Sequence, residues 1–450
     1  MRTICLTLPT NRACAPAIAA LVEEARYAAR RFGVEVCVLI LDTSDAQTFA
    51  DHATTVRAAT VRTGRDGEGV TLLHLGEDDQ RRVLRDLIQH AESADPAWLL
   101  DLMLPDGVSY GACTNRAFLL AAALGCESVH RRDSDSRYQQ VDGETIFPIH
   151  HELLSLGKRA GDARDGVTRV RLDPADEHKP VSMVGSSFIG ELSVDIGDIQ
   201  ARDPSIYYDV VSLWAASHRT PAEKRQLVDE SFTGAGVDPF TRDRSTLTIV
   251  DPMMVDMCNV SFYQVYEQMP LPPAKDTIGS DYFLMHVVRS ARLPGVHHNR
   301  NIENFFTRER RTDAGFIAYQ MRLTKFFLSM LYFHVIYDRM ADAGASLLDE
   351  RCRIRPSTIL PLVTDSTRLD KRENEERLAA IDRAYRTLGG RYAAFADLVA
   401  GRRRQLLDEA EADIWSFARL MDAWAPLLTA SKGRGFSKPE PYASQASTRV

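Results

Sequence analysis

A nearly continuous apolar run, V-E-V-C-V-L-I-L at residues 34–41, is followed at once by Asp42, Thr43 and Ser44. Parallel strands that helices cover on both faces have this composition, whereas a strand with one solvated face alternates between apolar and polar residues. Residues 3–8 form a short β-rich run, and residues 15–32 show a helical period. The sequence therefore predicts a β-α-β unit at the start of an α/β fold.

In open parallel sheets, ligands bind beyond the carboxyl ends of the strands. The loop Pro9, Thr10, Asn11 and Arg12 and the loop that starts at Asp42 follow the first two predicted strands. We therefore expect both loops to border one crevice. Two interpretations of Asp42 stay open: a nucleotide contact, or an ordinary turn or helix cap.

The 450 residues are 44% hydrophobic and 26% charged, with a net charge of -7. A chain of this length and composition can bury a large core and divide into subdomains. It has no basic excess to attract nucleic acid or an anionic membrane. We expect small-molecule partners, no nucleic acid and no membrane insertion.

Seven cysteines are scattered along the chain without any C-x-x-C pair. This pattern encodes neither a disulfide framework nor a zinc cluster. The apolar N-terminal stretch is interrupted by Asn11 and Arg12 before a secretory h-region could form. The sequence predicts reduced thiols and a cytoplasmic protein.

Residues 107–138 combine a glycine-bounded loop, a helix predicted near residues 113–124 and a short extended segment that ends in Asp133-Ser134-Asp135. Carboxylates two residues apart on a strand point the same way, and together they can hold a hard divalent cation. A cation with two protein carboxylates keeps open positions for phosphate oxygens. The alternative is a solvated acidic turn.

A second informative region lies downstream. In G-S-D-Y-F-L, Asp281 opens a predicted helix, where a carboxylate is either a cap or a functional group. In V-H-H-N-R, His297 and His298 are either metal ligands or a strand pair with one residue buried.

The ordered set of these motifs resembles the GT-A fold of nucleotide-sugar glycosyltransferases, over about residues 3–305. The loop P-T-N-R is similar to the family's first loop, P-x-N-E, and Asp42 stands where an aspartate commonly meets the base. G-V-S-Y-G-A-C-T-N-R, with Asn115 and Arg116, is similar to the helix before the metal motif, and D-S-D resembles that motif. G-S-D-Y-F-L and V-H-H-N-R resemble the family's later G-E-D-x-x-L and histidine motifs. The motif set also resembles glucosyl-3-phosphoglycerate and mannosylglycerate synthases.

The resemblance implies a Rossmann-like, mostly parallel central sheet with flanking helices, and a UDP- or GDP-sugar donor. It implies Mn²⁺ or Mg²⁺ held by Asp133, Asp135 and His298 or His297. Ser134 and Arg132 would lie near the donor, and Asp281 would be the catalytic carboxylate, as a base if the reaction inverts. Two departures stand out: the glutamate of the E-D pair is Ser280, and Arg131 and Arg132 crowd the strand before D-S-D. Those arginines either contact the diphosphate or form ion pairs with Asp133 and Asp135.

From residue 306 the chain changes character. We expect a helical appendage over residues 306–430, which covers the acceptor side or forms a homodimer, and a disordered tail over 431–450. The apolar run at residues 326–337 is too short to span a bilayer and predicts a buried helix or an oligomer contact.

We predict a metal-dependent glycosyltransferase that moves a hexose to a small soluble acceptor, with stereochemistry undecided. One alternative is a sugar-phosphate nucleotidyltransferase, although residues 9–15 lack the G-x-G-T-R phosphate loop. The other is a catalytically silent GT-A-like binding or scaffold protein.

Overall fold

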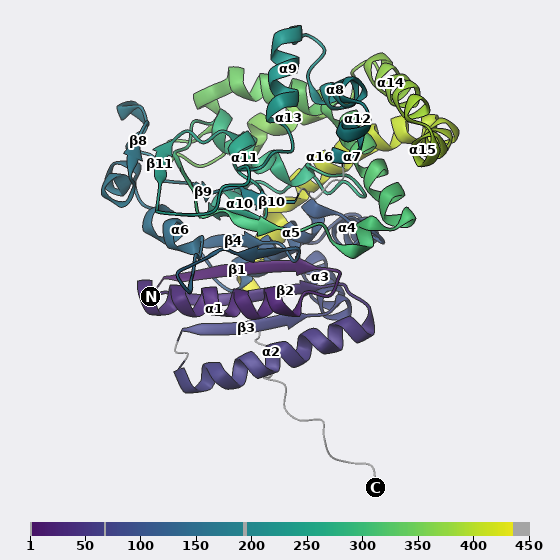
Figure 1. Ribbon diagram of the computed structural model, residues 1–450. Coiled ribbons are helices and arrows are strands. Elements are labelled where there is room, and N and C mark those ends of the chain that lie inside the picture. Colours follow the sequence, from purple (N-terminus) through teal and green to yellow (C-terminus); the bar gives the residue numbers. More distant parts are fainter. Residues whose placement is uncertain (1, 67–68, 192–195, 435–450) are drawn as a thin grey trace.

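The computed structural model describes residues 2–66, 69–191 and 196–434. It is an α/β structure built on a mixed sheet of nine strands in the order β3-β2-β1-β4-β12-β9-β13-β11-β8 (Figure 1). The strands of this sheet are β1 (Thr3–Thr10), β2 (Glu35–Asp42), β3 (Val70–Leu75), β4 (Ser128–Arg132), β8 (Arg169–Val170), β9 (Met183–Gly185), β11 (Ser245–Thr248), β12 (Asn259–Tyr263) and β13 (Gly295–His298).

Strands β3, β2, β1 and β4 are mutually parallel, and the parallel pair β1 and β2 with α1 (Ala15–Phe32) between them is the predicted β-α-β unit. Strand β12 is antiparallel to both β4 and β9, so the sheet is mixed beyond β4. Two smaller sheets join β10 (Phe188–Gly190), β14 (Ile302–Asn304) and β5 (Ser136–Tyr138), and β6 (Gln140–Val141) with β7 (Glu144–Thr145).

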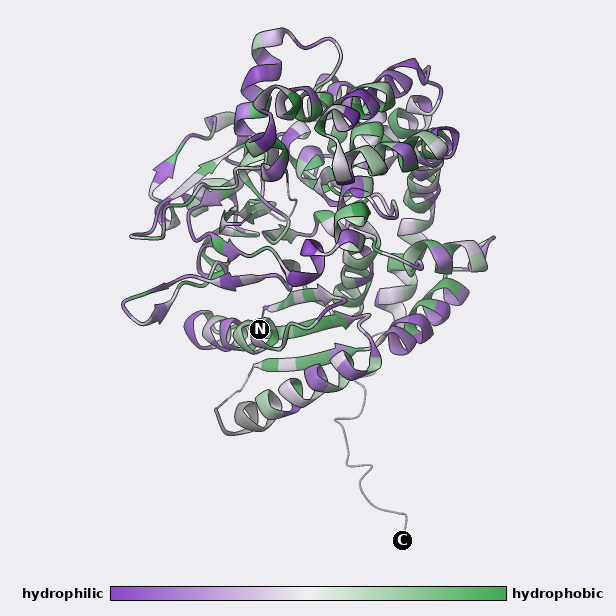
Figure 2. Ribbon diagram, turned by 45° about the vertical axis from the view of Figure 1, so that its right-hand side comes forward, coloured by the Kyte–Doolittle hydropathy of each residue, from purple (hydrophilic) through white to green (hydrophobic). Residues whose placement is uncertain are grey.

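Helices cover both faces of the parallel half. On one face Ile4, Leu6 and Leu8 pack with α1 (Ala15–Phe32), and on the other Cys5 and Leu39 join the core beneath α3 (Glu77–His90) and α5 (Tyr110–Ala123). The strands near the N-terminus are accordingly coloured as hydrophobic along their length (Figure 2). Burial on both faces explains why β2 has almost no polar residue.

The other helices lie between and around these elements, and those after residue 306 make up the helical region that the sequence predicted. They are α2 (Ala46–Asp66), α4 (Pro96–Met103), α6 (Ile149–Ser155), α7 (Gly197–Arg202), α8 (Pro204–Val211), α9 (Pro221–Glu230), α10 (Val265–Gln268), α11 (Phe283–Ser290), α12 (Asp313–Ala343), α13 (Pro356–Ser366), α14 (Arg372–Leu388), α15 (Gly390–Gly401) and α16 (Arg403–Arg434). Short 3-10 helices are η1 (Ala160–Gly166), η2 (Pro174–Asp176), η3 (Ser212–Trp214), η4 (Pro252–Met254), η5 (Ser280–Tyr282), η6 (Arg308–Arg311) and η7 (Gly344–Leu347).

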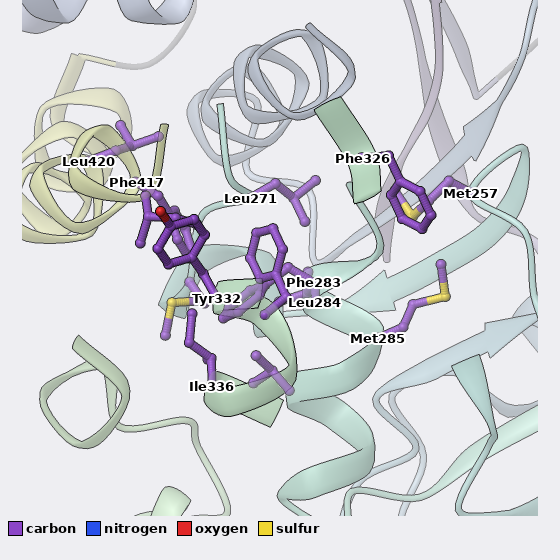
Figure 3. Close-up of a cluster of buried hydrophobic side chains, with 14 of the residues drawn as sticks. Met257, Leu271, Phe283, Leu284, Met285, Phe326, Tyr332, Ile336, Phe417 and Leu420 are labelled. Atoms are coloured by element: carbon purple, nitrogen blue, oxygen red, sulfur yellow. The ribbon is translucent and has the colours of Figure 1, made fainter. Parts of the chain in front are cut away.

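The C-terminal helices share one core with the sheet part of the chain. Figure 3 shows Phe283 and Leu284 of α11 beside Tyr332 of α12 and Phe417 of α16, all of them buried. Helix α16 also reaches α10, where the indole N–H of Trp424 donates to the carbonyl oxygen of Tyr266 at 3.1 Å. The apolar run at residues 326–337 is thus part of a buried helix, one of the two alternatives that the sequence left open.

The C-terminal helix extends further than the sequence predicted. Helix α16 continues to Arg434 and buries Ser431, so the predicted tail does not begin at residue 431, and residues 435–450 lie outside the described residues. The domain boundary near residue 305 and the homodimer stay predictions. None of the helices in the described ranges is long and apolar enough to cross a membrane, and none of the seven cysteines, which lie in those ranges, forms a disulfide.

Candidate functional site

A cavity of about 1160 Å³ opens beyond the carboxyl ends of β1 and β4. One half lies against the strand ends and is lined by residues 9–12, 104–110, 131 and 133–135. The other half lies between η3, α9, α11 and α12, and we call it the helical arm. Strands β1 and β4 are parallel neighbours, so the loops that follow them emerge at the same edge of the sheet.

The first loop lies where the sequence predicted it. Pro9, Thr10, Asn11 and Arg12 all line the cavity. The Thr10 hydroxyl donates to the carbonyl oxygen of Arg12 at 3.0 Å, which closes the loop into a tight turn. This turn directs the Arg12 side chain toward Asp135, 3.4 Å away.

The D-S-D motif also lies on the cavity, and arginines pair with both of its carboxylates. Arg131 lies 3.1 Å from Asp133, while Arg12 and Arg310 both pair with Asp135. Burial raises the pKa of Asp133 to about 6, although Arg131 opposes this shift. Ion pairing, one of the alternatives for the arginines of β4, is therefore confirmed for Arg131.

Asp281 faces the same arginine from the other side. Its carboxylate accepts a hydrogen bond from Arg131 at 3.0 Å, and burial raises the pKa of Asp281. The nearby Asp256 accepts a hydrogen bond from the hydroxyl of Tyr282 at 2.6 Å. We call Asp133, Asp135, Asp256 and Asp281 the acid cluster; it lines the cavity together with Arg12, Arg131 and Arg310.

The structure does not bring His297 or His298 to this cluster. Strand β13 lies three strands away from β4 in the sheet order, a separation of about 14 Å. The ring of His298 is buried and stacks on His151 at 5.3 Å, and its Nδ1 accepts a hydrogen bond from the backbone N–H of Arg300. Neither histidine is among the described residues that line the cavity. The interpretation as a strand pair with one buried residue fits this placement.

The resemblance implies a divalent cation at D-S-D, but the surrounding residues as arranged do not fit one. Within the described residues, no three His, Cys, Asp or Glu side chains that include Asp133 or Asp135 converge tightly enough to share an ion. A cation would also have to displace Arg12, Arg131 and Arg310 from the two carboxylates. The metal requirement stays a prediction.

Asp42 does not face the cavity, which corrects the expected nucleotide contact. Its fully buried carboxylate accepts hydrogen bonds from Nδ1 of His52 at 2.7 Å and from Nε2 of His74 at 2.9 Å. These three residues are close enough to bind a metal. However, Nε2 of His52 accepts a hydrogen bond from the backbone N–H of Cys14. In the neutral ring the proton is therefore on Nδ1, which donates a hydrogen bond to Asp42. The trio is a hydrogen-bonded tie between β2, α2 and β3.

Arg132 is likewise directed away from the cavity, and its expected role beside the donor is not supported. Neighbouring side chains on a strand point to opposite faces, so Arg131 and Arg132 diverge. The guanidinium of Arg132 is bound by Glu24 at 2.8 Å and Glu152 at 3.1 Å, and all three side chains are buried.

Asn115 and Arg116 have different placements on α5. The amide of Asn115 is buried, donates to the carbonyl oxygen of Leu271 and accepts from its N–H, each at 2.8 Å. It fixes the proline-rich segment 270–273 and lies away from the cavity. Arg116 borders the cavity, but its donors bind Gln80 and the carbonyl oxygen of Met103.

A family model described as a family of unknown function, DUF6271, matches residues 2–440. The chain belongs to this family. No curated protein matches the chain.

Proposed function

We propose that this DUF6271 protein is a glycosyltransferase with a GT-A-like fold that moves a sugar from a nucleotide diphosphate sugar to a hydroxyl acceptor. The observation that carries the proposal is the convergence of the first loop, D-S-D and Asp281 on one cavity, although they come from widely separated parts of the sequence. These pieces follow one another in the order that the resemblance implies. They also meet beyond the carboxyl ends of parallel strands, which is where ligands bind in such sheets.

The arginines beside the acid cluster can bind the phosphate groups of a diphosphate. Guanidinium groups form charge-assisted, often bidentate hydrogen bonds with phosphate oxygens. Arg12 and Arg310 both reach the cavity beside Asp135 and can exchange this carboxylate for phosphate oxygens. In this role they would offset the negative charge that develops on the leaving diphosphate.

In the transfer step, the acceptor oxygen bonds to the anomeric carbon, and the bond from this carbon to the diphosphate oxygen breaks with its electron pair on the diphosphate. The proton of the acceptor hydroxyl needs a base within hydrogen-bond reach. Asp281 suits this role if the configuration inverts, because it is buried at the cavity and Arg131 holds its carboxylate in place. If the configuration is retained, Asp281 would position a hydroxyl group.

A specific observation favours a second candidate, the catalytically silent binding or scaffold protein. Both carboxylates of D-S-D already have arginine partners, as they would in a protein that has no use for them as ligands. Such a protein would still bind a nucleotide in the cavity but would transfer no sugar.

The test is a calorimetric titration with a panel of UDP- and GDP-sugars, with and without Mn²⁺ or Mg²⁺, followed by assays of sugar hydrolysis and transfer. We expect at least one donor to bind, and Arg12→Gln to weaken its binding about tenfold because a charged contact is lost. Arg82→Gln is the control, since Arg82 lies on α3 with its side chain 73% exposed. Failure of every donor to bind would overturn the proposal, and binding without turnover would select the scaffold.

A further inference from the structure

The helical arm of the cavity differs in character from the half at the strand ends. It is lined by aromatic rings and methionines, among them Trp214, Phe232, Phe326, Tyr337, Met253 and Met330. These side chains come from η3, α12, η4 and the segment after α9. The arm therefore belongs to the helical part of the molecule, while the strand-end half belongs to the sheet.

The rings of this arm pack in two groups, one around Trp214 and one formed by His286 and Tyr337. Trp214 packs edge-on against Phe326 with ring centroids 5.3 Å apart, and its ring is tilted against that of Phe232 with centroids 5.8 Å apart. Further along, His286 stacks on Tyr337 with centroids 3.8 Å apart. Rings held by their neighbours at fixed angles present faces and edges to a ligand at little cost in conformational entropy, and they favour flat apolar molecules.

The charged side chains that line the arm disfavour the binding of a negatively charged ligand. Its two arginines are already paired, Arg219 with Glu223 at 3.0 Å and Arg289 with Asp251 at 2.5 Å. Glu230 and Asp338 add two further carboxylates to the lining.

The imidazoles of the arm do not change this balance. Burial lowers the pKa of both His286 and His334 to about 3, so both rings are neutral near pH 7. The described lining of the helical arm thus carries an excess of negative charge.

We infer that the helical arm is the acceptor subsite and takes an aromatic molecule with a hydroxyl group and no negative charge. This inference rests on the proposed function, because Asp281 and Tyr282, which lie on η5 immediately before α11, line the same cavity as the arm. It departs from what the resemblance suggests, since phosphoglycerate and glycerate are small anions without a ring. A positively charged aromatic molecule gains further from the acidic lining and the ring faces.

The experiment compares three phenols that differ mainly in charge: tyramine, which is cationic, tyrosol, which is neutral, and 4-hydroxyphenylacetate, which is anionic. Glycerol serves as a polar molecule without a ring. Each is titrated calorimetrically into the full-length protein, alone and after saturation with the best nucleotide sugar. We expect tyramine to bind at least about fivefold more tightly than 4-hydroxyphenylacetate because of the acidic lining, and glycerol not to bind.

Variants locate the binding. Trp214→Ala should weaken tyrosol and tyramine about tenfold, and Trp214→Phe should retain most of the affinity because it keeps a ring. The matched control is Trp415→Ala, since Trp415 is 45% exposed on α16 and is not among the described residues that line the cavity. Asp338→Asn removes charge without removing packing, so it should narrow the preference for tyramine over the anion even if Trp214→Ala fails to fold.

The outcomes separate this inference from the proposed function. If nucleotide sugars bind but none of the phenols does, or if the anion binds most tightly, the acceptor inference is overturned and the transferase proposal stands. If the phenols bind in a manner sensitive to Trp214 but no nucleotide sugar binds, the apolar site is real and the transferase proposal fails. If Trp415→Ala weakens phenol binding as much as Trp214→Ala, the site lies outside the helical arm and the inference is overturned.

Discussion

The guanidinium of Arg310 donates a hydrogen bond to the carboxylate of Asp135, although 175 residues separate the two in the sequence. Arg310 lies on η6, immediately before the long helix α12, and Asp135 follows β4. The pair therefore ties the helical part of the chain to the edge of the sheet. Both side chains are largely buried, 6% and 11% exposed, so water screens their attraction only weakly.

Removal of one partner should leave a buried charge with incomplete compensation. We expect Arg310→Gln to lower the free energy of unfolding by about 3 kcal/mol. Asp135→Asn should cost somewhat less, because it also relieves the burial of a carboxylate. In a double-mutant cycle by urea denaturation, the double variant should cost clearly less than the sum of the two single variants. Arg311→Gln is the control on the same short helix, since Arg311 is 59% exposed, and additive effects would mean that the pair contributes no coupling energy.

Replacement of Asp281 should separate donor binding from transfer. Asp281→Asn keeps the shape and one acceptor oxygen for Arg131, but it removes the basic carboxylate. We expect kcat to fall about 100-fold or more, with the donor Kd changed little. Single-turnover assays alongside calorimetry measure the two quantities. A variant with unchanged kcat would exclude Asp281 as the base and favour a positioning role.

Arg132 should matter for stability and not for ligand binding. Its guanidinium is enclosed by Glu24 and Glu152, so Arg132→Met leaves two buried carboxylates that share no cation. We expect a loss of about 3 to 5 kcal/mol in the free energy of unfolding. In protein that remains folded at low temperature, the nucleotide-sugar affinity should stay within about twofold of the original. A larger loss of nucleotide-sugar affinity in the folded variant would instead indicate that Arg132 contributes to the donor site.

Local patterns in the sequence predicted several of the elements and part of the site. The apolar run of β2 predicted the β-α-β unit, and the first loop and D-S-D were located because each directly follows a predicted extended segment. Asp42 and Arg132 follow the same logic, yet their side chains are directed into buried hydrogen-bond and ion-pair networks. The direction depends on His52 and His74, which lie 10 and 32 residues after Asp42, and on Glu24, which lies 108 residues before Arg132, and none of them belongs to a motif.

The rest of the site could not be predicted from the sequence. Arg310 stands in a run of charged residues at 308–311 that looks like a solvated face, and only the fold brings it to Asp135. Similarly, His298 was expected beside D-S-D because the motif order suggested it, but the sheet inserts β12 and β9 between β4 and β13. Strand order is a long-range property, and a linear motif does not determine it.

Gly111 should tolerate no side chain. A Cβ at this position would lie 1.8 Å from the carbonyl oxygen of Pro272, where the proline-rich segment docks on α5. We expect Gly111→Ala to cost about 3 kcal/mol or more, since the backbone of the segment would have to move. Gly401→Ala is the matched control, because among the described residues, apart from its chain neighbours and the backbone of its own helix, no atom lies within 4 Å of the place that a Cβ would take there. Equal melting temperatures for the two variants would show that the proline-rich segment can move away from the new Cβ at little cost.

The hydrogen-bonded trio at Asp42 should make stability depend on pH in a predictable direction. Hydrogen bonds from His74, Ser44 and His52 outweigh the effect of burial and lower the pKa of Asp42 from 3.8 to about 2. A carboxyl group whose pKa is depressed in the folded state stabilises the protein above its unfolded pKa, and this contribution is lost as the pH falls through the folded value. The contribution is about 2 kcal/mol at neutral pH and should disappear between about pH 4 and pH 2. Urea denaturation across this range measures it, and in Asp42→Asn this part of the acid dependence should be missing. An unchanged slope in that variant would mean that other carboxyl groups account for the loss.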